Sequence, residues 1–127
     1  MLKLLLVSPK KNSLSELASV LREFEGVDFS WAESGEEALG IASDTAIDLV
    51  VTDERLGDMT GLEFASRLLS VDPRINCATV SNLSPEDFHE AGEGLGLMAQ
   101  LPAQPNKEDA EGLLQRLRNL KGLTGSA

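Results

Sequence analysis

The sequence predicts an α/β domain built on a five-stranded parallel sheet with helices on both faces. Short apolar runs alternate along the chain with stretches whose apolar residues recur every three to four positions. The inner apolar runs are continuous, which is typical of parallel strands buried on both faces. Right-handed crossovers between successive strands then place helices on both sides of the sheet. We expect one domain over residues 1–121 and a flexible tail over residues 122–127.

The first strand, the first helix and the second strand follow one another from the N-terminus. Residues 2–7 are continuously apolar and predict an inner strand. Residues 13–16 fit a capping box that opens a helix, and Gly26 is placed to end that helix. Residues 27–31 alternate with a period of two, which predicts a strand nearer the edge of the sheet.

The middle of the chain repeats this order of helix and strand. Residues 34–37 form a second capping box before a short helix, and residues 47–52 predict the third strand. A helix is predicted over residues 61–70, and the Asp-Pro pair at 72–73 ends it. Residues 74–81 predict a fourth strand that is less apolar than the third. The apolar face of the helix comprises Leu62, Ala65, Leu68 and Leu69.

The last third of the chain adds two helices and the fifth strand. Ser84 is an N-cap residue followed by Pro85 at the first helical position, and this short helix extends to about residue 91. Glycines over residues 92–96 mark a helix stop and a turn. Residues 94–101 contain the fifth strand, and Asn106 caps the final helix.

Charge and cysteine content exclude several classes of function. The formal net charge of −10 argues against direct binding to nucleic acid or to an anionic membrane, because both repel an acidic surface. The apolar run near the N-terminus is too short to span a membrane, and no signal-peptide cleavage site follows it. Cys77 is the single cysteine and cannot form an intramolecular disulfide, so we expect a reducing, cytoplasmic setting.

Asp53 is the residue that points most clearly to function. The strand over residues 47–52 ends directly before it, and a polar loop with two glycines follows. In open α/β sheets, ligands and chemistry gather beyond the carboxyl ends of the strands. A carboxylate at that place can act as a nucleophile, a metal ligand or a helix cap, so Asp53 alone leaves these roles open.

The segment over residues 50–63 resembles the phosphoacceptor region of receiver domains in two-component response regulators. The matching features are the apolar strand ending in Asp53, the loop over residues 55–59 and the helix opening at 61–63. The resemblance extends from the first strand to the last helix and implies a flavodoxin-like strand order, 2-1-3-4-5. It also implies that Asp53 accepts a phosphoryl group from a histidine kinase, and that the chain is a signalling phosphoprotein and not an enzyme.

The resemblance implies further site residues, and this sequence departs from several of them. Receivers bind magnesium, Mg2+, through two acidic residues after the first strand, but Ser8 and Pro9 stand there. The hydroxyl that ends the fourth strand is retained as Ser81, whereas Gln104 replaces the lysine that follows the fifth strand. We therefore expect at most weak Mg2+ binding, with Asp53 as the remaining acidic ligand.

The loss of these charges bears directly on phosphorylation. A phosphoryl group on Asp53 would place roughly two negative charges beside an acidic loop. Without a compensating cation, repulsion costs on the order of 4 kcal/mol for each close pair of unit charges at an effective dielectric of about 20. One hypothesis is that Lys10 or Lys11 pairs with Asp53 in place of the cation. We favour two solvated lysines instead, because exposed ion pairs contribute little.

Two functions follow from these residues. The chain is a receiver in a phosphorelay, or it is a pseudo-receiver that acts as a protein-protein interaction module without phosphorylation. Small-molecule binding is a weaker third possibility, because no phosphate-cradling loop follows the first strand. The sequence leaves open whether the chain stands alone or belongs to a longer regulator.

In either case output passes through protein contacts, with a histidine kinase or another signalling protein as partner. By family analogy, the contact surface comprises the fourth helix, the fifth strand and the fifth helix, and this surface is also a candidate homodimer contact.

Overall fold

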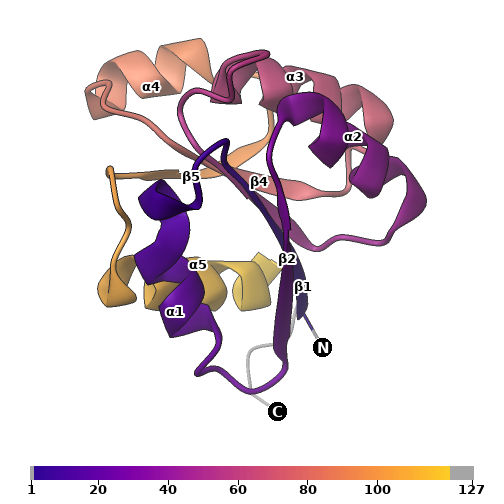
Figure 1. Cartoon of the computed structure of the whole chain (residues 1–127). Helices are drawn as coiled ribbons and strands as arrows, with labels where there is room; N and C mark the ends of the chain where they lie inside the picture. The colour runs from indigo at the N-terminus through magenta and orange to yellow at the C-terminus, as the bar shows by residue number, and fades with distance from the viewer. Residues whose placement is uncertain (1, 121–127) are drawn as a thin grey trace.

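The computed structural model describes residues 2–120, apart from the side chains of Lys11 and Asn12 (Figure 1). Five parallel strands form one sheet in the order β2-β1-β3-β4-β5, and helices alternate with them along the chain. The predicted fold class and strand order are confirmed. The strands are β1 (Leu2–Val7), β2 (Val27–Ala32), β3 (Leu49–Thr52), β4 (Asn76–Val80) and β5 (Leu97–Leu101). The helices are α1 (Ser15–Leu21), α2 (Gly35–Asp44), α3 (Gly61–Val71), α4 (Pro85–Ala91) and α5 (Lys107–Leu120).

The start of α1 differs from the sequence prediction. A 3-10 turn, η1 (Lys11–Leu14), precedes the helix, and Leu14 stands at the N-cap without a side-chain hydrogen bond. Ser13 lies inside this turn and therefore cannot act as the predicted cap. The helix also ends at Leu21, so Gly26 belongs to the turn before β2 and does not end the helix.

Most other predicted caps are present. Ser34 accepts a hydrogen bond from the backbone N–H of Glu37, but the Glu37 carboxylate accepts from Glu33, so the box is only half formed. Ser84 caps α4, and Asn106 and Asp109 cap the start of α5 reciprocally.

Two predicted strands begin later than expected, β4 also ends earlier, and β5 lies within the residues 94–101 that were predicted to contain it. β3 begins at Leu49 and not at residue 47, and β4 covers Asn76–Val80 within the predicted residues 74–81. β5 begins at Leu97, because Gly94 and Gly96 adopt positive φ in the turn that precedes it.

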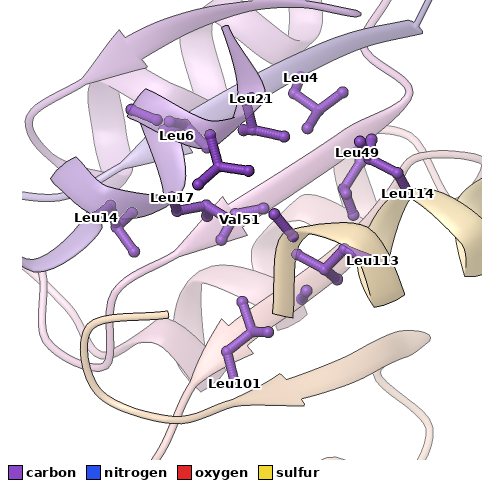
Figure 2. Packing of buried hydrophobic residues seen from close by; sticks show 14 of the residues in the cluster. Leu4, Leu6, Leu14, Leu17, Leu21, Leu49, Val51, Leu101, Leu113 and Leu114 are labelled. Atoms are coloured by element: carbon purple, nitrogen blue, oxygen red, sulfur yellow. The ribbon is translucent and has the colours of Figure 1, made fainter. Parts of the chain in front are cut away.

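Two apolar clusters fill the two sides of the sheet. Figure 2 shows the first, in which leucines of α1 and α5 pack on β1 and β3. The second joins α2 and α3 to the opposite face. Leu4 and Leu6 face one cluster and Leu5 faces the other, so β1 is buried on both faces as predicted. Each leucine that is buried in this way contributes about 2 kcal/mol, so the central strands form a rigid base for the loops beyond them.

The helices also bear on membrane association. Within residues 2–120, no helix combines the length and the apolar character that a membrane span requires. The predicted tail over residues 122–127 lies outside the described residues.

Candidate functional site

The candidate site lies beyond the carboxyl ends of β1 and β3. These strands are neighbours, and Val7 pairs with Thr52 in their register. The backbone N–H of Asp53 donates to the carbonyl of Val7 at 2.9 Å, which extends the pairing by one step. Ser8 and Asp53, the next residues of the two strands, therefore lie side by side. The structure brings these two predicted site residues together.

Both oxygens of the Asp53 carboxylate lie within hydrogen-bond distance of a neutral donor group. Oδ2 lies 3.0 Å from the hydroxyl of Ser8, and Oδ1 accepts from the backbone N–H of Glu54 at 2.8 Å. Ser8 is 1% exposed, whereas Asp53 is half-buried. The Ser8 hydroxyl also lies 2.5 Å from the carbonyl of Lys10. Since a hydroxyl carries one proton, Ser8 donates to one of these two acceptors at a time.

The residues around Asp53 do not fit a magnesium site. Pro9 carries no side-chain oxygen, and a serine hydroxyl is a poor ligand for a hard divalent cation. Glu54, the nearest acidic neighbour in sequence, is held by the backbone N–H of Asn82, which donates to its Oε2 at 3.0 Å. Within the described chain, no group of three or more His, Cys, Asp or Glu side chains could hold a metal ion.

The structure does not support Lys10 as a partner of Asp53. Its side chain is exposed, and no ion pair joins it to Asp53 in the described part of the chain. The backbone carbonyl of Lys10, and not its ammonium group, contacts the site through Ser8. The side chain of Lys11 lies outside the described residues, so the hypothesis for that lysine stays a prediction.

Ser81 lies beyond the carboxyl end of β4 and is connected to Asp53 indirectly. Its side chain is buried, and its hydroxyl accepts from the backbone N–H of Leu83 at 3.2 Å. Glu54 follows Asp53 and binds Asn82, which follows Ser81, so Glu54 ties the two loops together. A pocket of about 310 Å³ between these loops is lined in part by Glu54, Arg55 and Ser81. Sequence reasoning missed Glu54, although an acidic residue directly after Asp53 was a signal.

Gln104 is not brought to Asp53 by any contact. It is exposed, its φ is 52°, and its side-chain amide makes no hydrogen bond to another described residue. Another glutamine, Gln100 on β5, takes part in the loop network that sequence reasoning missed. Its amide donates to the carbonyls of Ser81 at 3.2 Å and Leu83 at 2.8 Å. The loop between β4 and α4 is therefore held from β5 as well as from Glu54.

Close packing positions the loop that follows Asp53. A Cβ atom added at Gly61 would come within 2.6 Å of both the backbone oxygen of Asp53 and the hydroxyl of Thr79. Residue 61 must therefore be glycine for α3 to begin so near β3. At the α3 N-terminus, Thr60 and Glu63 form a complete capping box.

Asp58 fixes the far side of the same loop. Its carboxylate accepts hydrogen bonds from the backbone N–H groups of Gly35 and Glu36, each at 3.0 Å, at the N-terminus of α2. These bonds lower the pKa of the Asp58 carboxyl because they stabilise the charged form. Cys77, by contrast, is fully buried in β4, and burial raises the pKa of its thiol to about 12, which makes it an inert core residue.

Comparison with known proteins gives consistent matches. A family model described as the response regulator receiver domain matches residues 4–116. A response regulator receiver protein from Anaeromyxobacter sp. (strain Fw109-5) is 33% identical over 102 residues, which cover 80% of this chain. The chain spans 42% of that relative's length.

Solved structures agree in fold. The chemotaxis protein CheY4 of Vibrio cholerae superimposes with a TM-score of 0.79 at 26% identity, over 92% of this chain and 98% of that chain. A CheY-like receiver domain protein from Methanospirillum hungatei JF-1 gives a TM-score of 0.82 at 21% identity, over 98% of this chain and 99% of that chain.

Proposed function

Because this chain belongs to the receiver domain family of response regulators, we propose that Asp53 is its phosphoacceptor position in a phosphorelay. The half-buried carboxylate of Asp53 beyond the central strand β3 is the observation that carries this proposal. Receiver domains are generally signalling modules without enzymatic activity, and they act by contact with histidine kinases and other signalling proteins. The proposed setting is the cytoplasm.

The residues around Asp53 supply only part of what phosphoryl transfer requires. Phosphoryl transfer requires positioning and neutralisation of negative charge more than covalent chemistry from the protein. Asp53 is well positioned by β3, but among the described side chains its carboxylate contacts a neutral hydroxyl and, from the backbone, one N–H group. With Ser8, Pro9 and Gln104 at the supporting positions, phosphorylation of Asp53 is slow.

The second candidate function is a pseudo-receiver that binds partners without phosphorylation. The surroundings of Asp53 favour this alternative, because the groups that lie next to its carboxylate oxygens are a hydroxyl and a backbone N–H, both of them neutral. A phosphoryl group on Asp53 would add roughly two negative charges beside Glu54, with only these neutral groups to stabilise them. Both candidate functions use the same fold, and they differ in whether Asp53 is phosphorylated.

In both cases the proposed partner surface comprises α4, β5 and α5, which is also a candidate homodimer contact. The net charge of −10 favours protein partners over direct contact with nucleic acid or an anionic membrane.

Treatment with acetyl phosphate and Mg2+, followed by intact-mass analysis, separates the two functions. A slow mass gain of one phosphoryl group that is absent from Asp53→Asn supports the phosphoacceptor. No gain after prolonged exposure supports the pseudo-receiver. The Asp53→Asn variant is a matched control, because the amide retains the shape of the carboxyl group and removes its nucleophilic charge.

A further inference from the structure

We propose that the groove between α4 and β5 binds a basic partner segment that inserts an apolar side chain. This inference rests on the proposed function, since it specifies the partner chemistry of the surface through which the domain acts. It is carried by three observations: a helix without buried residues, a groove beside it that is lined in part by apolar side chains, and a local excess of negative charge.

Helix α4 is the least covered helix of the domain. None of its residues is buried, whereas each of the other four α-helices buries at least three. Figure 1 shows α4 at the edge of the molecule, on the same side of the sheet as α2 and α3. Phe88 on α4 is half-buried, and Leu83 just before the helix is 37% exposed. Apolar surface is therefore left uncovered here.

The groove itself has a volume of about 420 Å³ and separates α4 from β5. This volume is comparable to the roughly 300–1,000 Å³ of small-molecule pockets, so the groove has room for one large side chain. Its apolar lining includes Phe88, Leu97 and Met98. β5 is an edge strand, and four of its five residues are only partly buried. A large apolar side chain from a partner would complete this packing.

The acidic residues around the groove favour a positively charged partner. Residues 75–106 contain no lysine or arginine. The acidic residues on and beside α4, all exposed, are Glu86, Asp87, Glu90 and Glu93. Among the described residues that line the groove, Arg116 is the one lysine or arginine, and its guanidinium donates to the carbonyl of Met98 at 2.7 Å. His89 also lines the groove.

This charge pattern favours a basic partner over a second copy of the chain. Two copies that met through this face would bring their acidic helices together, and like charges across an interface repel. Lysine or arginine residues on either side of an apolar anchor would instead be attracted to α4 and steered into the groove.

The test measures binding of a dye-labelled amphipathic peptide of lysine and leucine by fluorescence anisotropy, with the unphosphorylated full chain. Glu90→Lys combined with Glu93→Lys is expected to weaken binding about tenfold, because two attractions become repulsions. The matched control, Glu23→Lys with Glu25→Lys, reverses two exposed charges on the α1–β2 turn and is expected to change affinity less than about twofold. A peptide with serine in place of leucine is expected to bind about tenfold more weakly, because it cannot fill the groove.

Three results would overturn the proposal. Equal losses in the two charge-reversed proteins would show non-specific attraction, and equal binding of the serine peptide would show that the groove takes no part. A dimer of the unmodified chain in sedimentation experiments that Glu90→Lys with Glu93→Lys abolishes would assign the face to a second copy. Because the peptide test requires no phosphorylation, its failure and a failure of Asp53 to accept a phosphoryl group are separate outcomes.

Discussion

Ser8 changes the chemistry of the site beside Asp53, whereas the fold that positions the site is unchanged. Its position directly after β1, beside Asp53, was predictable from the sequence, because neighbouring parallel strands end at the same edge of the sheet. Its role was not predictable. A sequence reveals that a carboxylate is missing, but it does not show that the replacing hydroxyl lies 3.0 Å from Asp53 Oδ2.

Ser8→Ala is expected to lower the free energy of unfolding by about 1 kcal/mol, because Ser8 is buried and its hydroxyl donates a hydrogen bond to either Asp53 or the Lys10 carbonyl. Urea denaturation measures this change. Ser30→Ala, on the exposed side of the edge strand β2, is the control and is expected to change stability by less than about 0.5 kcal/mol. Equal effects of the two substitutions would mean that the Ser8 hydroxyl contributes no specific hydrogen bond.

Gly61→Ala is expected to destabilise the protein by about 1–3 kcal/mol, because the new methyl group would overlap the Asp53 backbone oxygen and the Thr79 hydroxyl. Gly40→Ala, on the exposed face of α2 where nothing lies within 4 Å, is expected to stabilise it by about 0.5–1 kcal/mol. Thermal or urea denaturation of both variants measures the contrast. A stable Gly61→Ala protein would contradict the close approach of α3 to β3.

At the scale of elements, the loop between β3 and α3 connects three parts of the fold. Asp53 begins the loop directly after β3, Asp58 caps the N-terminus of α2, and Thr60 caps α3. The local signals for these helices were visible in the sequence. The bond from Asp58 to α2 was not, because it joins residues that are far apart along the chain and depends on how the loop folds over the sheet.

The Asp58 contact predicts a pH dependence of stability. The pKa of this carboxyl lies below its usual value of 3.8 because the N–H groups of Gly35 and Glu36 stabilise its charged form. A lowered pKa means that the stabilisation is fully present well above pH 3.8 and is lost as the pH falls through the lowered pKa. Asp58→Ala is therefore expected to lower the melting temperature at pH 7, and this difference is expected to shrink in strong acid.

Melting curves of the unmodified protein and Asp58→Ala across this pH range provide the measurement. Glu25→Ala controls for the lost charge, because Glu25 is an exposed acidic residue of the turn before β2. An equal and pH-independent decrease in both variants would contradict a capping role for Asp58.

At the scale of the whole molecule, the alternation of apolar runs and helical patterns predicted the fold class, and the family resemblance supplied the strand order. The packing of individual side chains was harder to predict from the sequence. Phe64 is fully buried in α3, although the predicted apolar face omitted it. The links from Glu54 to Asn82 and from Gln100 to Ser81 also required the structure, because they bridge loops that only the assembled sheet brings together.

The assembled site therefore presents the carboxylate of Asp53, the proposed phosphoacceptor, with Ser8 and Pro9 beside it in place of an acidic pair that could hold a cation. The central claim of our account is that the residues next to Asp53 do not form a magnesium site. Replacing Ser8 and Pro9 together with aspartate would place two carboxylates after β1, next to Asp53. Such a variant is the matched comparison, because it alters the two positions at which the acidic pair is missing.

Magnesium titration of the isotope-labelled protein, followed through the backbone amide signals of Ser8, Asp53 and Glu54, tests this claim most directly. We expect no saturable shift of these signals in the unmodified chain and a saturable shift in the variant with Ser8→Asp and Pro9→Asp. A saturable shift centred on Asp53 in the unmodified chain would contradict the account.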